Sequence, residues 1–245
     1  MSSKRPRDNL YATPLEAISD FRFDEQVVGV FADMINRSVP GYGTLISMLR
    51  VIAGHFAQPE SRCYDLGCSL GAATLALRHG IDKPGIDIVA VDNSEAMVEQ
   101  CRQHIAMDES SIPVEVICDD LRNIEIENAS VVVLNFTLQF LSTDERDQLL
   151  KKIARGMKPD GVLILSEKIE FDNENDNELF VDLHHDFKRV QGYSDLEISQ
   201  KRSALENVLI PATIEQHLQR LNSAGFSDSR CWFQCLNFIS ILATR

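Results

Sequence analysis

The chain has 245 residues, of which 44% are hydrophobic and 25% are charged, an ordinary composition for one globular domain with a full core. Asp and Glu outnumber Lys and Arg by 37 to 24, and the formal net charge is −13. A protein that grips a nucleic-acid backbone usually carries a basic face, so this balance argues against direct nucleic-acid binding and favours a small substrate. No apolar run reaches the roughly 18–20 residues of a membrane span, so we expect none.

The N-terminus is basic at Lys4, Arg5 and Arg7, but acid and amide residues follow in place of an apolar stretch. This pattern is not that of a secretory signal, and it predicts a loose tail. Residues 1–57 as a whole are expected to form an N-terminal helical extension. Its helix should end near Ser38, because a Val-Pro-Gly segment follows.

Residues 58–245 alternate between apolar runs and helical patterns, which predicts a doubly wound parallel sheet. Several runs are continuously apolar, as strands covered on both faces require. Helices are expected after Ser94 and Ser142, because each serine is a good N-cap and acidic residues follow it. The predicted parallel strands are Arg62–Asp65, Asp87–Asp92, Pro113–Cys118, Ser130–Asn135 and Val162–Lys168.

The last part of the chain breaks this alternation. Apolar runs at Arg230–Phe233 and Phe238–Ala243 are too close together for a crossover helix and suit a hairpin. A helical insertion is expected at about residues 171–209, where cover elements commonly close a substrate pocket. The predicted fold class is therefore α/β. It is a Rossmann-like sheet of the class I S-adenosyl-L-methionine (SAM)-dependent methyltransferase type, mostly parallel with an antiparallel C-terminal hairpin.

A glycine turn follows the first predicted strand, and Gly67 and Asp65 would shape it around the amino acid part of a ligand. Its spacing is not Gly-x-Gly-x-x-Gly and no Gly-Lys-Ser/Thr follows, which argues against NAD and ATP. A nucleoside without phosphates fits this turn better, and SAM is the commonest cofactor of that kind. Asp92 ends the second strand, where its carboxylate can accept from both ribose hydroxyls. Its alternative role as a helix cap is disfavoured, because Ser94 is the better cap.

Polar residues also follow the third and fourth predicted strands. An acid at Asp119 or Asp120 can accept from the adenine amino group, with a solvated surface acid as the alternative for Asp119. Asn135 stands at the mouth of the expected pocket. It could support the methionine end of SAM or the transferred group.

The expected insertion contains a histidine pair and four basic residues. Packing and surface hydrogen bonds explain His184 and His185 better than a metal or acid–base role, because the segment is an amphipathic helix. Each basic residue alone is most simply a surface charge, but together they could clamp a carboxylate. They are Lys188, Arg189, Lys201 and Arg202.

The six cysteines form no Cys-x-x-Cys pair, and no metal site is expected. They are predicted to be buried thiols of a protein in a reducing cytoplasm. They are Cys63, Cys68, Cys101, Cys118, Cys231 and Cys235.

Five segments carry a more specific pattern. They are Ser38-Val39-Pro40-Gly41-Tyr42, Tyr64–Thr74, Val133–Leu141, Leu196–Ser203 and Trp232–Cys235. Together they resemble the bacterial carboxy-S-adenosyl-L-methionine synthase family, with similarity from about Phe23 to Leu242. The glycine turn alone is typical of any methyltransferase-like protein, whereas the segments around Tyr42 and Arg202 are far more specific.

The resemblance implies conversion of SAM and prephenate to carboxy-SAM and phenylpyruvate, without a metal. Prephenate would lose its ring carboxyl as CO₂ and its hydroxyl as hydroxide. The hydroxide would take a proton from the SAM methyl group, and the resulting ylide would capture the CO₂. The protein would mainly position the reactants and exclude bulk water. A cytoplasmic homodimer is also implied, with its product passed to a separate tRNA carboxymethyltransferase that modifies wobble uridine.

Ligand contacts follow from the same resemblance. Tyr42 and Arg202 are the implied catalytic residues. Arg202 would clamp the new carboxylate of carboxy-SAM, because a buried carboxylate needs a charged partner. The implied SAM contacts are Tyr42, Gly67, Cys68, Ser69, Asp92, Asn93, Asp120, Leu121, Asn135 and Arg202.

Two other functions are compatible with the sequence. A conventional SAM-dependent small-molecule methyltransferase would share the whole cofactor site and differ at Arg202 and in its product. A SAM-binding module that regulates a partner would bind the ligand tightly but would not turn over prephenate.

Overall fold

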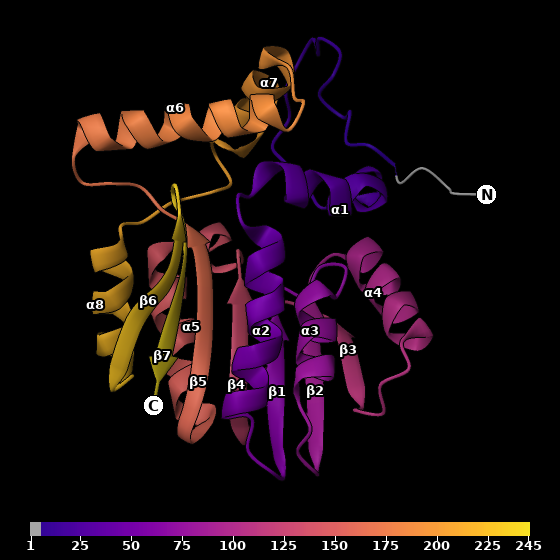
Figure 1. Cartoon of the computed structure of the whole chain (residues 1–245), viewed down its shortest axis with the longest axis vertical. Coiled ribbons are helices and arrows are strands. Elements are labelled where there is room, and N and C mark those ends of the chain that lie inside the picture. Colours follow the sequence, from indigo (N-terminus) through magenta and orange to yellow (C-terminus); the bar gives the residue numbers. More distant parts are fainter. Residues whose placement is uncertain (1–5) are drawn as a thin grey trace.

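The computed structural model describes residues 6–245, so Lys4 and Arg5 of the predicted tail lie outside the described residues. A seven-stranded sheet forms the centre of the molecule, in the order β3-β2-β1-β4-β5-β7-β6 (Figure 1). The strands are β1 Ser61–Leu66, β2 Ile86–Asp92, β3 Val114–Cys118, β4 Ala129–Asn135, β5 Met157–Lys168, β6 Asp228–Cys235 and β7 Phe238–Thr244.

The predicted sheet is confirmed, with strand boundaries that differ by one or two residues except at β5, where the change is largest. β1 to β5 are parallel where they pair, and β7 pairs antiparallel with both β5 and β6. The C-terminal hairpin turns at Leu236 and Asn237. β5 begins at Met157 rather than Val162, because Met157 already pairs with Ala129 ahead of a register shift.

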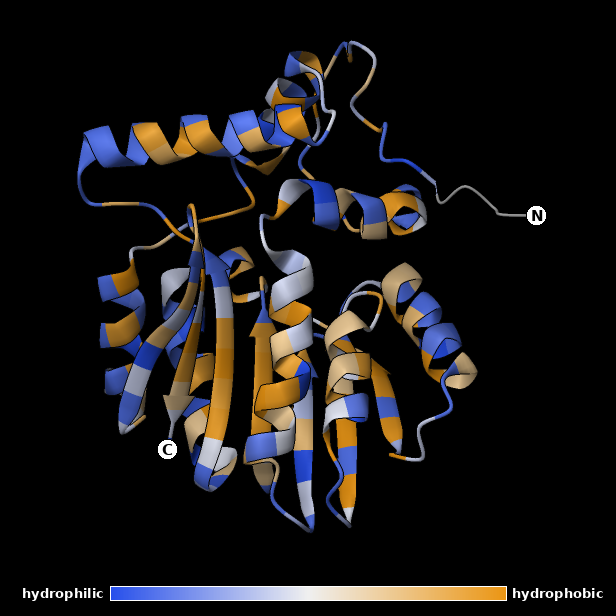
Figure 2. Cartoon of the chain, viewed as in Figure 1, coloured by the Kyte–Doolittle hydropathy of each residue, from blue (hydrophilic) through white to orange (hydrophobic). Residues whose placement is uncertain are grey.

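Helices cover both faces of the sheet. α2 (Tyr42–Phe56), α3 (Ala72–Gly80) and α4 (Glu95–Met107) lie on one face, and α5 (Thr143–Gly156) and α8 (Ile214–Ala224) on the other. Alternate residues of the strands supply the two cores, so β4 and the middle of β5 are almost continuously apolar (Figure 2). No helix within residues 6–245 is long and apolar enough to cross a membrane.

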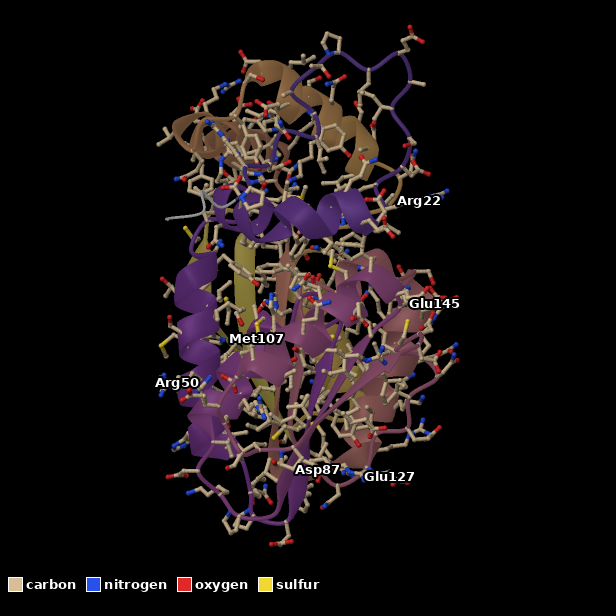
Figure 3. The ribbon with its side chains drawn as sticks, turned by 90° about the vertical axis from the view of Figure 1, so that its right-hand side faces the viewer. Arg22, Arg50, Asp87, Met107, Glu127 and Glu145 are labelled. Carbon is tan, nitrogen blue, oxygen red and sulfur yellow. The ribbon has the colours of Figure 1, made fainter. Side chains whose placement is uncertain are left out.

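Three helices form a cap over the end of the sheet where the parallel strands finish. α1 (Glu25–Ser38) crosses this end, and α6 (Glu174–Val190) and α7 (Asp195–Leu205) lie beyond it (Figure 1). The side view shows α1 between the sheet and α6–α7, well away from Arg50 and Glu127 on the outside of the sheet body (Figure 3). The helix end predicted at Ser38 is confirmed, and α6 and α7 occupy the predicted insertion.

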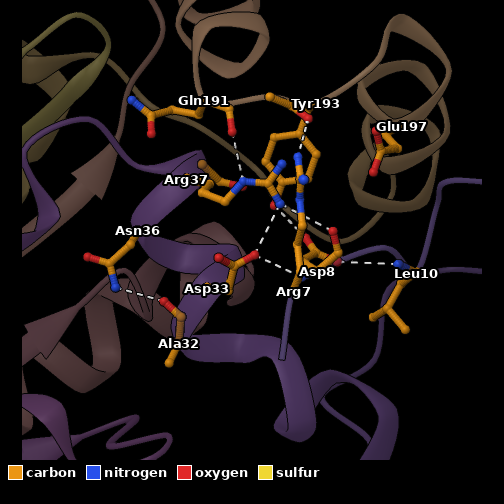
Figure 4. A network of polar contacts seen from close by, with 12 residues as sticks. Arg7, Asp8, Leu10, Ala32, Asp33, Asn36, Arg37, Gln191, Tyr193 and Glu197 are labelled. Atoms are coloured by element: carbon orange, nitrogen blue, oxygen red, sulfur yellow. Dashed lines mark hydrogen bonds and ion pairs between the residues drawn. The ribbon is translucent and has the colours of Figure 1, made fainter. Parts of the chain in front are cut away.

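The segment before α1 is tied to the cap rather than loose (Figure 4). Asp8 is buried and accepts a 2.5 Å hydrogen bond from the Tyr193 hydroxyl. The Arg37 guanidinium stacks 3.8 Å from the centre of the Tyr193 ring and donates to Asp33 at 3.0 Å. Arg7 donates to the Gly192 carbonyl at 2.9 Å. The prediction of a loose tail is therefore wrong from Arg7 onward, because this buried network holds the segment.

The cysteine prediction holds for three of the six thiols. Cys63, Cys68 and Cys101 are buried, whereas Cys118 and Cys231 are exposed and Cys235 is half-buried. The reason is topological, since β3 and β6 are the edge strands of the sheet and helices cover them poorly. The prediction that all six are buried is wrong for these edge positions.

Candidate active site

A cavity of about 460 Å³ lies between the ends of the parallel strands and the cap, a size typical of small-molecule sites. A second cavity of about 140 Å³ adjoins it and shares Gly67, Ser69 and Asn135. The larger one is also lined by Asp92, Asn93, Asp120 and Leu121, and the smaller one by Tyr42 and Cys68. All the predicted SAM contacts except Arg202 therefore meet at one place.

The glycine turn after β1 needs its first glycine. Gly67 has a φ of 88°, and a Cβ added there would overlap the side chain of Thr137 in the loop after β4. Hydrogen bonds from the Gly67 and Cys68 N–H groups to the Val91 carbonyl, at 2.8 and 2.9 Å, fix the turn against β2. The absence of a side chain at Gly67 thus lets the loops after β1 and β4 approach each other.

Asp92 joins this turn to the helix that follows β2. Its two carboxylate oxygens accept from the N–H groups of Ser69 and Ser94, each at 2.9 Å. Ser94, as predicted, caps α4 by accepting from the Met97 N–H at 3.3 Å. Burial raises the pKa of Asp92. Each carboxylate oxygen keeps a lone pair, so the group is oriented and still able to accept from ribose hydroxyls.

The smaller cavity contains two unpaired acceptors. Asp65 is fully buried, accepts from the Thr74 hydroxyl at 2.5 Å and has its pKa raised to about 6 by burial. Its other oxygen and the side-chain oxygen of Asn135 have no partner among the described residues. Burial, and then the charge of Asp65, raises the pKa of Tyr42 in the same cavity. Unpaired buried acceptors fit a ligand that brings hydrogen-bond donors, such as the ammonium group of SAM.

Four carboxyl side chains line one end of the larger cavity, which we call the acidic end: Asp92, Asp119, Asp120 and Glu145. Asp120 accepts two hydrogen bonds from the Arg122 guanidinium, at 2.8 and 2.5 Å, and one from the Arg122 backbone N–H at 2.9 Å, and these bonds lower its pKa. Arg122 also pairs with Glu145. Asp119 is exposed, in agreement with the alternative hypothesis of a solvated surface acid, and it also borders the cavity.

Three lysines also line the cavity, on the side of β5, which the sheet order separates from β2 and β3, and we call this side the lysine end. Lys168 ends β5, Lys188 lies in α6 and Lys201 in α7. Burial, and then neighbouring lysines, lowers the pKa of Lys188 to about 7, and burial lowers that of Lys201 to about 8. Burial, and then Arg202, lowers that of Lys168. Sequence reasoning placed Lys168 at the end of a predicted strand but not in the site, although a cation at the carboxyl end of a buried parallel strand is an available signal.

His184 stands beside the lysines and is a packed residue, as predicted. Its Nε2 lies 2.8 Å from the Ser38 carbonyl oxygen, and its ring meets Phe238 edge-on at 4.9 Å. Burial, and then Lys188 and Lys168, lowers its pKa to about 2. The imidazole is therefore neutral, with Nε2–H as the donor to Ser38.

The two arginines of the predicted carboxylate clamp lie outside both cavities. Arg189 is exposed and pairs with Asp186 and Asp195 at 2.6 and 2.7 Å. Arg202 is exposed on α7 and lines neither cavity of its own chain. Its charge still contributes to the lowered pKa of Lys168, so it lies close to the lysine end.

A buried acid fixes the loop that connects the two ends, and sequence reasoning did not identify it. Glu167 is fully buried and accepts from the N–H groups of Leu138 and Gln139, at 2.9 and 3.0 Å, in the short helix η1 (Leu138–Phe140). Burial raises its pKa to about 8. The available signal was an acid inside the apolar run of β5.

Similarity to known proteins agrees with this geometry. Residues 64–161 match the Methyltransferase domain family. Relatives named carboxy-S-adenosyl-L-methionine synthase include one from Trichlorobacter lovleyi, 59% identical over 239 residues, with 97% of this chain and 98% of the relative covered. One from Photobacterium profundum is 57% identical, with 98% of each chain covered. The chain belongs to the carboxy-S-adenosyl-L-methionine synthase family. It is an enzyme of that type, so the predicted family and enzyme class are confirmed.

Solved structures confirm the fold. A protein from Methanococcus maripaludis, named as a putative SAM-dependent methyltransferase, has a TM-score of 0.60 and 20% identity, with 94% of this chain and 96% of that chain covered. Human N-acetylserotonin methyltransferase in complex with SAM also has a TM-score of 0.60, with 17% identity and coverage of 90% of this chain and 55% of that one. Together with the family, these likenesses support the involvement of SAM.

Proposed function

We propose that the protein converts SAM and prephenate to carboxy-SAM, phenylpyruvate and water. The ring carboxyl of prephenate leaves as CO₂ and forms a new bond to the SAM methyl carbon. That carbon loses one proton, which combines with the departing hydroxide of prephenate to give water. The relatives named carboxy-SAM synthase support the product, and the prephenate substrate belongs to our proposal.

One observation carries the proposal: a single cavity has an acidic end and a lysine end. A nucleoside with a cationic sulfonium suits the first, and an anionic second reactant suits the second. A methyltransferase acting on a neutral acceptor has no use for buried ammonium groups beside its cofactor.

The nucleoside contacts follow from the positions of the side chains. Asp92 would accept from the ribose hydroxyls, and Asp120, with the backbone of Leu121, would contact the adenine. The unpaired oxygens of Asp65 and Asn135 would accept from the ammonium group, close to the Tyr42 hydroxyl. The roles of Gly67, Cys68, Ser69 and Asn93 are backbone contacts around the turn.

Arg202 would contact the new carboxylate of carboxy-SAM. In this chain it is exposed beside the lysine end, so the contact requires a turn of its side chain or a second copy of the protein. A second copy is also suggested by exposed apolar residues on α6 and α7, including Leu179 at 52% and Val190 at 82%. We propose a symmetric homodimer through this surface. Sedimentation as a monomer across micromolar concentrations would contradict it.

The product would pass to a separate tRNA carboxymethyltransferase in the cytoplasm. The net charge of −13 supports a division of labour in which this protein handles small metabolites and binds no tRNA.

Mass spectrometry tests the proposed reaction. The purified protein, given SAM and prephenate, should yield carboxy-SAM and phenylpyruvate in equal amounts, and a nucleoside that copurifies should have the mass of carboxy-SAM. A conventional methyltransferase would instead yield S-adenosylhomocysteine and a methylated acceptor. Tight nucleoside binding without turnover would indicate a regulatory binding module.

A further inference from the structure

The lysine end brings together three cations from elements far apart in the chain. Lys168 finishes the central strand β5, whereas Lys188 and Lys201 project from the two cap helices α6 and α7. Lys188 is only 8% exposed and Lys201 only 7%. The sheet and the cap thus contribute charge to the same cavity wall.

Among the residues that the structure describes, two of these ammonium groups have no ion-pair partner. Lys201 donates to the Ser38 hydroxyl at 3.1 Å and lies 3.8 Å from Asp8. Within residues 6–245, Lys168 and Lys188 have neither an ion-pair nor a hydrogen-bond partner for their side-chain nitrogen, and the charges that act on them are those of other cations. The polar atoms buried out of reach of solvent do not include either nitrogen, so both face the cavity space.

Such an arrangement is unfavourable in an empty site. A buried cation without a partner loses hydration and gains no attraction in return, and the lowered pKa values of the lysines express that penalty. An anion in the cavity would reverse it, since each ammonium would gain a charge-assisted hydrogen bond.

Aromatic side chains around the lysines indicate which kind of anion would fit there. Phe136 and Phe238 meet edge-on at 5.9 Å, and the neutral His184 packs on Phe238. All three line the cavity with the lysines. A ligand that combines carboxylates with a carbon ring would satisfy both the cations and this aromatic wall.

We propose that Lys168, Lys188 and Lys201 bind the carboxylates of the second reactant, a small cyclic dicarboxylic acid, and hold it against Phe136 and Phe238. The proposal rests on the proposed function in one respect, because prephenate is such an acid. It differs from the role given to Arg202, which concerns the carboxylate of the product.

Lys188→Met tests this site, since it keeps the length and packing of the side chain and removes the charge. The KM for prephenate should rise about 10- to 100-fold, the effect of losing a hydrogen bond between charged groups. The dissociation constants of SAM and carboxy-SAM should stay within about threefold of the parent values. Lys168→Met should behave similarly and carries the test if Lys188→Met does not fold. Lys151→Met, at an exposed position of α5, is the matched control and should change nothing.

A direct titration separates this proposal from the proposed reaction. Prephenate should bind the parent protein loaded with S-adenosylhomocysteine, and binding should weaken by the same 10- to 100-fold in the lysine variants. If the parent makes carboxy-SAM but both variants keep its KM and affinity for prephenate, the lysine site is wrong and the reaction stands. If prephenate binds through the lysines without turnover, the site stands and the proposed reaction fails. If the lysine variants bind carboxy-SAM more weakly and bind prephenate as the parent does, the lysines contact the product and the proposal is overturned.

Discussion

The two ends of the cavity are built in different ways. Three carboxylates of the acidic end lie at or just after the ends of strands, Asp92 at the end of β2 and Asp119 and Asp120 after β3, and Glu145 lies in the first turn of α5. The lysine end combines the last residue of β5 with two helices of the cap. At the acidic end Asp92 and Asp120 are already hydrogen-bonded within the protein. At the lysine end Lys168 and Lys188 have no such partners in the described chain.

The side chains of the acidic end are therefore held in place before a ligand binds, whereas the ammonium groups of the lysine end would gain partners only when an anion binds. A carboxylate fixed by backbone N–H groups changes little when a neutral ribose arrives. Unpaired ammonium groups change their protonation and their energy when an anion arrives. The affinity for the nucleoside should therefore depend on individual carboxylates of the acidic end. The affinity for the second reactant should depend on the lysines and on how well the cap helices are ordered.

The largest expected effect concerns Arg202, outside both ends. If the Arg202 guanidinium pairs with the new carboxylate, Arg202→Ala should weaken the binding of carboxy-SAM relative to that of SAM by roughly 2–5 kcal/mol. Arg202→Lys should recover only part of this, because an ammonium cannot make two parallel bonds. Calorimetric titration of both ligands measures the difference. An alanine variant with the parent's relative preference would remove Arg202 from the carboxylate site.

Glu167 tests the loop that joins the two ends. Glu167→Ala would leave the N–H groups of Leu138 and Gln139 buried without an acceptor, which should lower the free energy of unfolding by about 2–4 kcal/mol. Urea unfolding measures this. Glu178→Ala, at an exposed position of α6, should change it by less than about 0.5 kcal/mol. Equal effects of the two substitutions would show that Glu167 does not support the loop.

Asp92 tests the acidic end alone. Asp92→Ala should weaken SAM and carboxy-SAM equally, by roughly 1.5–3 kcal/mol, because both ligands present the same ribose hydroxyls. The affinity for prephenate in the loaded protein should stay near the parent value. Asp82→Ala, on an exposed loop, is the control. Unchanged nucleoside affinity would exclude Asp92 from the site.

The smallest effect is a pH dependence of stability at the lysine end. Lys188 has a pKa near 7 in the folded chain, lowered by burial, Lys201 and Lys168, and one near 10.5 when unfolded. Between these values the unfolded chain binds more protons, so the free energy of unfolding should rise with pH. From pH 7 to 9 the parent should gain roughly 1–2 kcal/mol relative to Lys188→Met. Parallel unfolding curves for the two proteins would show that Lys188 carries an ordinary pKa.

The sequence predicts the features that depend on local chemistry. Parallel strands, the hairpin and the glycine turn follow from apolar periodicity and turn residues, and Asp92 follows from its place at a strand end. The features that sequence reasoning missed depend on contacts between distant segments. Asp8 is held by Tyr193, and Lys168 meets Lys188 only after the cap has folded over the sheet. For Arg202 the sequence motif is specific, but the side chain lies outside the cavity of its own chain, so the motif alone did not predict its position.

The most direct test of the central claim follows the carbon that moves. Prephenate labelled with ¹³C in its ring carboxyl is incubated with SAM and the protein, and the products are separated by mass. We predict that carboxy-SAM carries the label in its new carboxyl group, with unlabelled phenylpyruvate formed in equal amount. Labelled CO₂ released without labelled carboxy-SAM, or S-adenosylhomocysteine formed together with a methylated acceptor, would contradict the proposed function.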